Sequence, residues 1–130
     1  MNFLKKIFPF DSETDYQHAL KEDMLGDKKK AFWLFEKSAE KNHAGAQFYC
    51  GYMSLYGRGT PKDINKAFTF INKSANQGYY KAQYLLSQMY LFGVGIYKNK
   101  TEGDKWLERA KESAMDLSKL SFLDLYEDFE

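Results

Sequence analysis

A segment of this 130-residue chain occurs twice, 36 residues apart, and this repeat limits the possible folds more than any other feature. AQFYCGYMSLYGRGT begins at Ala46, and AQYLLSQMYLFGVGI begins at Ala82. Both copies end on a pair of glycines with one residue between them, at 57–59 and 93–95. Self-similarity at a fixed period of this size predicts stacked copies of one supersecondary unit.

Within each copy, the apolar residues have the spacing of two successive helices. Residues 67, 70, 71, 74 and 75 follow the i, i+3, i+4, i+7, i+8 pattern of one helix stripe, and a similar stripe precedes them at 48–56. We therefore predict helices over 12–25, 28–41, 44–56, 63–77, 80–92 and 101–114, with a closing helix over 117–129.

The predicted helix ends carry suitable residues. Asp63 and Thr101 stand where helices begin, and their side chains can accept a backbone N–H. Asn42 and Gly78 stand where helices end, and both tolerate the left-handed conformation of a C-cap. Each unit is thus predicted to be a helix, a turn and a second helix, with the shorter turn Gly26-Asp27 in the first unit.

The repeated segment resembles the Sel1-like repeat, a relative of the tetratricopeptide repeat, whose pattern is A-x-x-x-L-G-x-x-Y-x-x-G-x-G-V, then K-A-x-x-W, then K-A-A-x-x-G. The second unit keeps Ala46, Gly51, Gly57 and Gly59, and the third keeps Ala82, Leu86, Tyr90, Gly93, Gly95 and Trp106. Departures are Cys50 for Leu, Ser54 for Tyr, Ser87 for Gly and Lys111 for Ala. The resemblance implies an all-α fold, an α/α right-handed superhelical solenoid of about three helix pairs plus a C-terminal capping helix.

We divide the chain accordingly. We expect residues 1–11 to be an N-terminal cap segment and residues 12–115 to be the repeat domain, with units at about 12–43, 44–79 and 80–115. We expect residues 116–130 to form an acidic C-terminal capping helix.

Composition narrows the classes of protein. Hydrophobic residues make up 44% and charged residues 28%, as in an ordinary soluble domain, and the net charge of +1 predicts no nucleic-acid partner. Cys50 is the only cysteine, so no intramolecular disulfide can form. No secretory signal or membrane-spanning run appears, so a cytoplasmic location is expected. MNFLKKIF could be an amphipathic anchor, but we expect its apolar residues to pack as the N-terminal cap, without stable membrane association.

The stretch LYGRGTPKD looks like a phosphate-binding loop, because two glycines flank Arg58 ahead of a lysine-bearing helix. A phosphate cradle needs a strand before the glycines, whereas here a helix precedes them, and the second copy has Val94 in place of the cation. We therefore interpret the loop as a turn. His18 and His43 are expected at the surface and Cys50 in the core, and no catalytic, cofactor or metal residues are predicted.

Aromatic residues make up 18% of the chain, and about half of them are expected in the core. In solenoids of this kind the first helix of each unit lines the concave side. The resemblance therefore implies an aromatic-lined, partner-binding groove formed by Tyr16 in the first unit, Phe48, Tyr52, Leu55 and Tyr56 in the second, and Lys81, Tyr84, Gln88, Leu91 and Phe92 in the third. Arg58 and Lys62 would add a basic rim.

Charge is unevenly distributed along the chain. Residues 46–81 hold five cations against Asp63, a net +4, and residues 114–130 hold five anions against Lys119, a net −4. The acidic end is either the polar face of a cap or a segment that lies over the basic middle of its own chain or of a neighbour.

The resemblance implies non-catalytic binding of another protein. One hypothesis is a bacterial immunity protein that neutralises a cognate toxin. The alternative is an adaptor or regulatory scaffold in signalling or protein quality control, and a ligand-binding or enzymatic solenoid is a weaker alternative. The sequence leaves the oligomeric state open.

Overall fold

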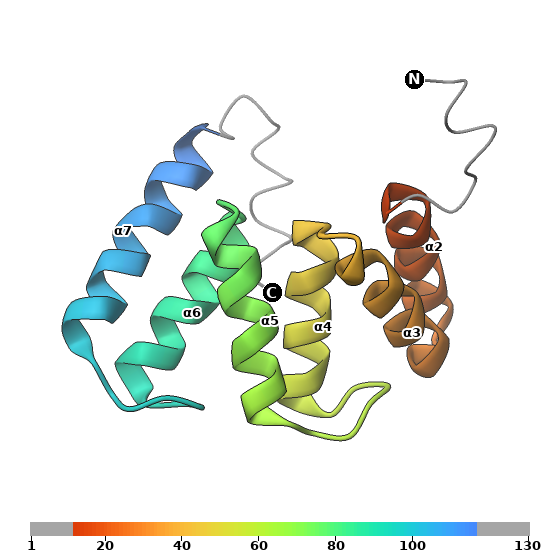
Figure 1. The fold of residues 1–130 in the computed structure, drawn as a ribbon, viewed down its shortest axis with the longest axis horizontal. Coiled ribbons are helices and arrows are strands. Elements are labelled where there is room, and N and C mark those ends of the chain that lie inside the picture. Colours follow the sequence, from red (N-terminus) through yellow and green to blue (C-terminus); the bar gives the residue numbers. More distant parts are fainter. Residues whose placement is uncertain (1–11, 117–130) are drawn as a thin grey trace.

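The computed structural model describes residues 12–116, and the predictions for the N-terminal cap segment 1–11 and for a closing helix over 117–129 lie outside these residues. The described residues form six α-helices without strands. They are α2 (Ser12–Leu25), α3 (Lys28–Glu40), α4 (Ala44–Tyr56), α5 (Ile64–Asn76), α6 (Tyr80–Phe92) and α7 (Lys100–Asp116). Figure 1 shows them following one another across the molecule in chain order, and each helix packs against the next. The predicted all-α solenoid of helix pairs is confirmed.

Most helix ends follow the predicted chemistry. Asp63 Oδ1 accepts the backbone N–H of Lys66 at 3.0 Å and so caps α5. Asn42 adopts φ 67° after α3, the left-handed conformation that was predicted for a C-cap. The prediction of Thr101 as the cap of α7 is wrong. Asn99 has this role, because its Oδ1 accepts the N–H of Glu102 at 3.1 Å and the helix already begins at Lys100.

The glycine pairs turn the chain inside the second and third units and also bring its backbone against the preceding unit. Gly57 caps α4 in the left-handed conformation, with φ 67°, as predicted. A Cβ atom on Gly59 would lie 2.2 Å from the carbonyl oxygen of Lys28, and one on Gly95 would lie 2.8 Å from Cγ2 of Ile64. Lys28 and Ile64 are 36 residues apart and each begins the second helix of a unit. The second glycine therefore serves the contact between units.

The core is formed where one unit meets the next. In the first interface, Phe35 and Ala39 of α3 belong to the same buried cluster as Ala46, Cys50 and Met53 of α4. In the second interface, Ile71 and Ala75 of α5 cluster with Ala82, Leu86 and Met89 of α6. Each residue of the second set lies 36 positions after its counterpart in the first. The repeat in the sequence is therefore a repeat of one packing interface, in which each fully buried Leu, Ile, Phe or Met contributes about 1.5–3 kcal/mol.

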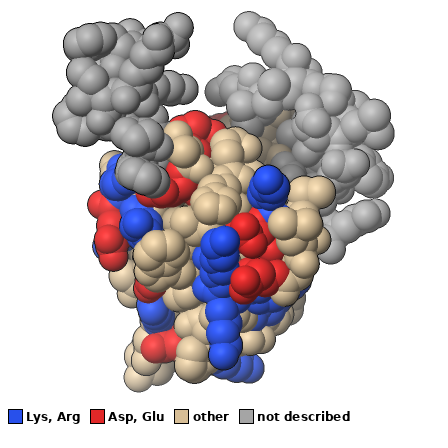
Figure 2. All heavy atoms as spheres, turned by 90° about the vertical axis from the view of Figure 1, so that its right-hand side faces the viewer, with Lys and Arg blue, Asp and Glu red and all other residues tan. Residues whose placement is uncertain are grey.

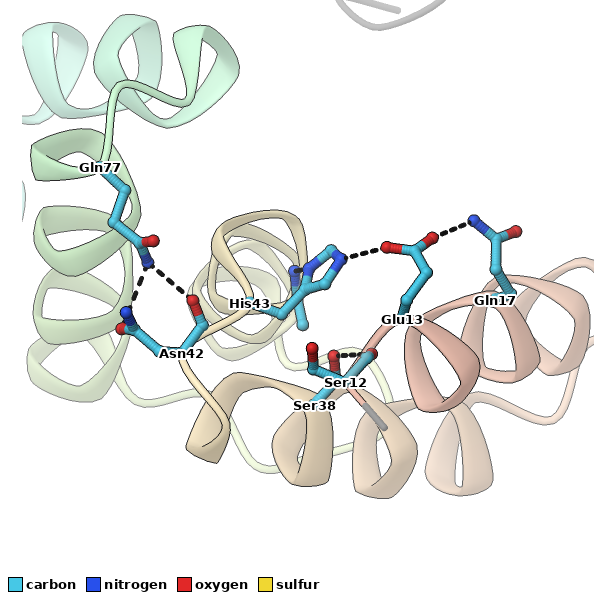
Figure 3. Close-up of polar contacts among 8 residues, drawn as sticks. Ser12, Glu13, Gln17, Ser38, Asn42, His43 and Gln77 are labelled. Atoms are coloured by element: carbon cyan, nitrogen blue, oxygen red, sulfur yellow. Dashed lines mark hydrogen bonds and ion pairs between the residues drawn. The ribbon is translucent and has the colours of Figure 1, made fainter. Parts of the chain in front are cut away.

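Polar side chains tie the units together at the other end of α4 from the glycine turn (Figure 3). Gln77 Nε2 donates to the carbonyl oxygen of Asn42 at 3.0 Å, which joins the end of one unit to the end of the previous one. His43 Nδ1 accepts the N–H of Ala46 at 3.1 Å, while its Nε2 lies 2.8 Å from Oε2 of Glu13 on α2. His43 was predicted at the surface, and its side chain is partly buried at 18% exposure, because it caps α4 and stacks on Tyr16 at 4.3 Å.

Lysines and carboxylates alternate over the α2–α3 end of the molecule (Figure 2). Lys28 pairs with Asp23 at 2.6 Å, and Lys30 pairs with Glu22 at 3.2 Å. Two of the three lysines in the run 28–30 are thus paired with neighbouring carboxylates, and this end does not present a field of one sign.

Candidate protein-binding groove

A groove of about 410 Å³ lies between the C-terminal ends of α4 and α6, the first helices of adjacent units. Helix α5 packs against both of these helices. The lining of the groove is mostly apolar and consists of Leu55, Tyr56, Lys62, Ile64, Leu85, Gln88, Met89, Phe92 and Val94. Five of the predicted partner-binding residues are among them, namely Leu55, Tyr56, Lys62, Gln88 and Phe92.

An aromatic row on α4 leads into this groove. The rings of Phe48 and Tyr52 stack with centroids 6.0 Å apart, and Tyr52 and Tyr56 follow at 5.0 Å. The three residues are spaced by four positions and therefore lie along one helix face. The guanidinium of Arg58 lies 6.0 Å from the centre of the Tyr52 ring, so this predicted rim residue also packs over the row.

The row extends beyond the predicted residues. The ring centroid of Tyr49 lies 5.3 Å from that of Phe48 and 6.1 Å from that of Tyr16 on α2. The ring centroid of Tyr79 lies 5.5 Å from that of Phe48. Neither Tyr49 nor Tyr79 was predicted as a member of the row. Tyr49 stands three positions before Tyr52, so helical spacing alone could have included it. Tyr79 precedes α6, so the helical spacing of the groove residues could not have included it.

Several predicted groove residues are less accessible than a free surface would require. Phe48, Leu55 and Lys81 are each only 8% exposed, and the Lys81 ammonium lies 5.8 Å from the ring centre of Tyr49. These three side chains therefore pack inside the molecule and offer little area to a partner. Leu91 faces the unit's second helix, because a Cβ atom on Gly103 of α7 would lie 2.6 Å from it.

Two large apolar side chains of the groove lining, Tyr56 and Phe92, are exposed. Tyr56 is 59% exposed and Phe92 is 71% exposed, and both are large apolar side chains beside a concave apolar surface. Aromatic side chains in such a position are typical of protein-interaction hot spots. Tyr84, at 38% exposure, lies instead in a separate groove between α6 and α7.

Cys50, the one cysteine of the chain, is buried in the core. Burial raises the pKa of the Cys50 thiol far above its ordinary value, so the thiol stays protonated inside the first interface. No three His, Cys, Asp or Glu side chains within residues 12–116 converge on a position that could hold a metal ion. In the same part of the chain, no helix has the length and apolar character needed to cross a membrane.

Comparison with known proteins agrees with this architecture. The family model described as "Sel1 repeat" matches residues 16–43, 44–79 and 81–114. The chain belongs to the Sel1 repeat family. Sel1 repeats are typically scaffolds for protein–protein interactions and are generally not catalytic. No curated protein matches the chain at a significant level.

Solved structures include similar Sel1 solenoids. A Sel1 repeat protein from Oxalobacter formigenes superposes with a TM-score of 0.67 at 34% identity, over 70% of this chain and 26% of that one. The protein c5321 of uropathogenic Escherichia coli, a protective antigen, superposes with a TM-score of 0.73 at 27% identity, over 91% of this chain and 28% of that one. The chain thus spans about a quarter of the length of these two proteins. The cysteine-rich protein B of Helicobacter pylori superposes with a TM-score of 0.65 at 21% identity, over 78% of this chain and 87% of that one. It shares the fold.

Proposed function

We propose that this Sel1 repeat chain is a non-catalytic binding module that takes an apolar segment of a partner protein into the groove between α4 and α6. The observation that carries the proposal is the exposure of Tyr56 and Phe92 on either side of a groove with an apolar lining. An exposed aromatic side chain offers about 150–250 Å² of contact area. At about 25 cal/mol per Å², covering both rings could supply several kcal/mol of binding free energy.

The basic rim has a secondary role in this proposal. Arg58 and Lys62 are exposed beside the groove, and they would attract an acidic residue next to the partner's apolar segment. The rest of the predicted +4 region contributes less. Lys66 is paired with Glu36 at 3.2 Å, and Lys81 is buried among aromatic rings. The rim should therefore influence the association rate and its salt dependence more than the affinity.

The experiment uses 12-residue peptides selected from a displayed random library against the full chain. The double variant Tyr56→Ala/Phe92→Ala should weaken the selected peptides at least tenfold, because ~1.4 kcal/mol corresponds to a factor of ten. The matched control is Trp33→Ala/Tyr97→Ala, which removes two exposed aromatic rings outside the groove lining. If both variants bind alike, the groove is not the binding site.

The biological role within this proposal is a narrower hypothesis. An immunity protein would capture one cognate toxin tightly, whereas an adaptor or regulatory scaffold would bind several proteins with moderate affinity. Affinity purification from the native host under stringent washing tells them apart, because only the first role predicts a single stoichiometric partner. The cytoplasmic location expected from the sequence also stays a prediction.

The enzymatic or ligand-binding alternative has a direct test. A thermal-shift screen of the full chain against nucleotides and divalent metal ions should give no stabilisation in a purely protein-binding module. A ligand present at 100 times its Kd stabilises the folded state by about 2.7 kcal/mol, which shifts the midpoint by several degrees. A midpoint shift of that size would favour the enzymatic or ligand-binding alternative.

A further inference from the structure

The last residue of the first helix in every unit is a large apolar residue that is exposed to solvent. These residues are Leu25 at the end of α2, Tyr56 at the end of α4 and Phe92 at the end of α6. They are 70%, 59% and 71% exposed, and Met24 beside Leu25 is 87% exposed. Figure 1 shows the three helix ends, with the turns that follow them, along the lower side of the molecule. We call these four residues the helix-end anchors.

The turn after α4 brings the second unit against the first at this side of the molecule. Its Gly59 packs so closely on Lys28 that an added Cβ would lie 2.2 Å from the carbonyl oxygen of Lys28. Lys28 begins α3 and stands only three positions after Leu25. The turn after α6 packs in the same way on the start of α5. The helix ends of neighbouring units are therefore joined by one repeated contact.

The repeat register extends the binding surface to the first unit. Val94 lines the α4–α6 groove together with Tyr56 and Phe92, and Arg58 is its counterpart 36 positions earlier. Arg58 should therefore border the corresponding surface between the ends of α2 and α4. The helix-end anchors thus follow one another across the three units.

Cations accompany the anchors in the second and third units. Asp63 is the only Asp or Glu between residues 44 and 98, and its Oδ1 is occupied by the cap of α5. Arg58 and Lys62 follow the end of α4, and Lys98 follows the end of α6. All three side chains are exposed, and none of them forms an ion pair with a described residue. These two helix ends therefore favour a partner that carries carboxylates.

The first-unit end differs in charge. Residues 22–30 carry three anions and three cations. Lys28 is paired with Asp23 at 2.6 Å, and Asp27 caps α3 by accepting the N–H of Lys30 at 3.1 Å. Met24 and Leu25 therefore offer apolar contact without an excess of charge of one sign beside them.

We propose that the partner is an acidic, extended segment whose apolar side chains contact the helix-end anchors of all three units. This inference rests on the proposed function and enlarges its site, because Met24 and Leu25 join the α4–α6 groove. The carboxylates of the partner lie over the second and third units, beside Lys62 and Lys98. The end of the partner that lies over the first unit is apolar.

The solenoid sets the spacing of the partner's apolar residues. A second helix stands between the first helices of neighbouring units, so their ends should lie one to two helix diameters apart, roughly 10–20 Å. An extended chain advances about 3.3 Å per residue and would present an apolar residue every three to six positions. A helical partner rises about 1.5 Å per residue and would need about seven to thirteen positions.

The experiment uses 16-residue peptides selected from a displayed random library against the full chain. We expect them to carry Asp or Glu near apolar residues that recur every three to six positions. Met24→Ala/Leu25→Ala should weaken the selected peptides on the order of tenfold. The matched control is Trp33→Ala/Met115→Ala, which removes two exposed apolar side chains from second helices. All four residues are exposed, so neither variant should lower the thermal midpoint by more than about 3 °C.

The carboxylates of the partner are tested with a second pair of variants. Lys62→Gln/Lys98→Gln should weaken the selected peptides on the order of tenfold at low salt and less at high salt. The matched control is Lys29→Gln/Lys73→Gln, which removes two exposed cations from second helices. Equal losses for the two variants would show that overall charge, and not the position of these lysines, attracts the peptide, and would overturn the proposed placement of the carboxylates.

A shortened peptide separates direct contact from an effect transmitted through the fold. Without the apolar residue farthest from its carboxylates, the peptide should lose its sensitivity to Met24→Ala/Leu25→Ala. It should keep its sensitivity to Tyr56→Ala/Phe92→Ala. If the shortened peptide responds to the first-unit variant as strongly as before, Met24 and Leu25 do not contact the partner.

The possible failures are distinguishable. Peptides that respond to Tyr56→Ala/Phe92→Ala but not to Met24→Ala/Leu25→Ala would overturn the three-unit surface and leave the proposed function intact. Enrichment in Lys or Arg would overturn the acidic partner, and apolar residues seven or more positions apart would overturn the extended one. If no selected peptide responds to Tyr56→Ala/Phe92→Ala, both the proposed function and this inference fail.

Discussion

Gly59 shows at the scale of one residue how a turn becomes a contact between units. Its φ of 73° lies in the left-handed region, and a Cβ atom would meet the carbonyl oxygen of Lys28 at 2.2 Å. Backbone cannot move aside as a flexible side chain does. The glycine that first suggested a phosphate loop is therefore required by the approach of two backbones.

We predict that Gly59→Ala is far more destabilising than Gly78→Ala. Both residues have positive φ, but a Cβ on Gly78 would meet nothing within 4 Å. Gly78→Ala should cost only the left-handed penalty of about 1–2 kcal/mol, whereas Gly59→Ala adds a steric clash and should cost about 3 kcal/mol or more. Urea unfolding measures both free energies. Equal costs would contradict the backbone contact.

Cys50 makes a residue-scale prediction about pH. Burial raises the pKa of its thiol in the folded state, so above the unfolded pKa of about 8.5 the unfolded chain loses a proton that the folded chain keeps. The free energy of unfolding should therefore fall with rising pH in this range, by up to about 1.4 kcal/mol per pH unit. Well below that pKa the thiol is protonated in both states and contributes no slope.

The Cys50→Ala variant isolates this effect from the titration of tyrosines and lysines. It should be less stable at neutral pH, because the methyl group fills less of the first interface. Its stability should fall less steeply than that of the parent between about pH 8.5 and 10, as followed by urea unfolding at each pH. Parallel profiles would show that Cys50 is not the titrating group.

At the scale of the helix, the start of α7 is capped by Asn99, whereas the sequence predicted Thr101. Asn99→Ala should destabilise the chain by about 0.5–2 kcal/mol, because the N–H of Glu102 loses its acceptor. Thr101→Ala should change stability by less than about 0.5 kcal/mol, since Thr101 is exposed and lies inside the helix. Thermal unfolding of both variants measures the two losses of stability. A larger loss for Thr101→Ala than for Asn99→Ala would show that Thr101 is the cap.

The helices themselves were predictable because their signals are local. The bounds of α2, α4 and α6 agree with prediction, and those of the other helices differ by one or two residues. Burial was less predictable. Phe48 and Tyr56 lie on the same stripe of α4, yet one is 8% exposed and the other is 59% exposed. Helical period places both on one face, and only the position of α6 decides which of them it covers.

Whether a side chain lies in the groove or in the core therefore depends on how the helices pack, and the local sequence does not reveal this. Lys81 illustrates this most clearly, since a lysine at a groove position was expected to be accessible. Its aliphatic stem is buried, and its ammonium lies 5.8 Å from the Tyr49 ring centre and 5.9 Å from that of Tyr79. Tyr49 and Tyr79 were absent from the predicted groove, so the two rings that surround Lys81 were missed.

At the scale of the molecule, stability should be a sum of interfaces between neighbours. Within residues 12–116, most buried apolar residues belong to two clusters, one centred where α3 meets α4 and one where α5 meets α6. In a solenoid each unit contacts only its neighbours, so energetic coupling should be strong within an interface and weak between interfaces. This architecture also suits a chain that matches about a quarter of the longer Sel1 proteins, because each added unit repeats one interface.

Double-mutant cycles test this description. Ile71→Ala and Leu86→Ala remove fully buried side chains from the second cluster, and each should cost about 2–5 kcal/mol. Combined, they should depart from additivity by about 0.5 kcal/mol or more, because they share one cavity. Leu34→Ala, in the first cluster, should combine with Leu86→Ala additively to within about 0.5 kcal/mol. Urea unfolding with unchanged m-values measures each free energy. Equal coupling in both pairs would mean that the three units share one cooperative core, and that a partner bound at α4 and α6 would stabilise the first unit as much as the third.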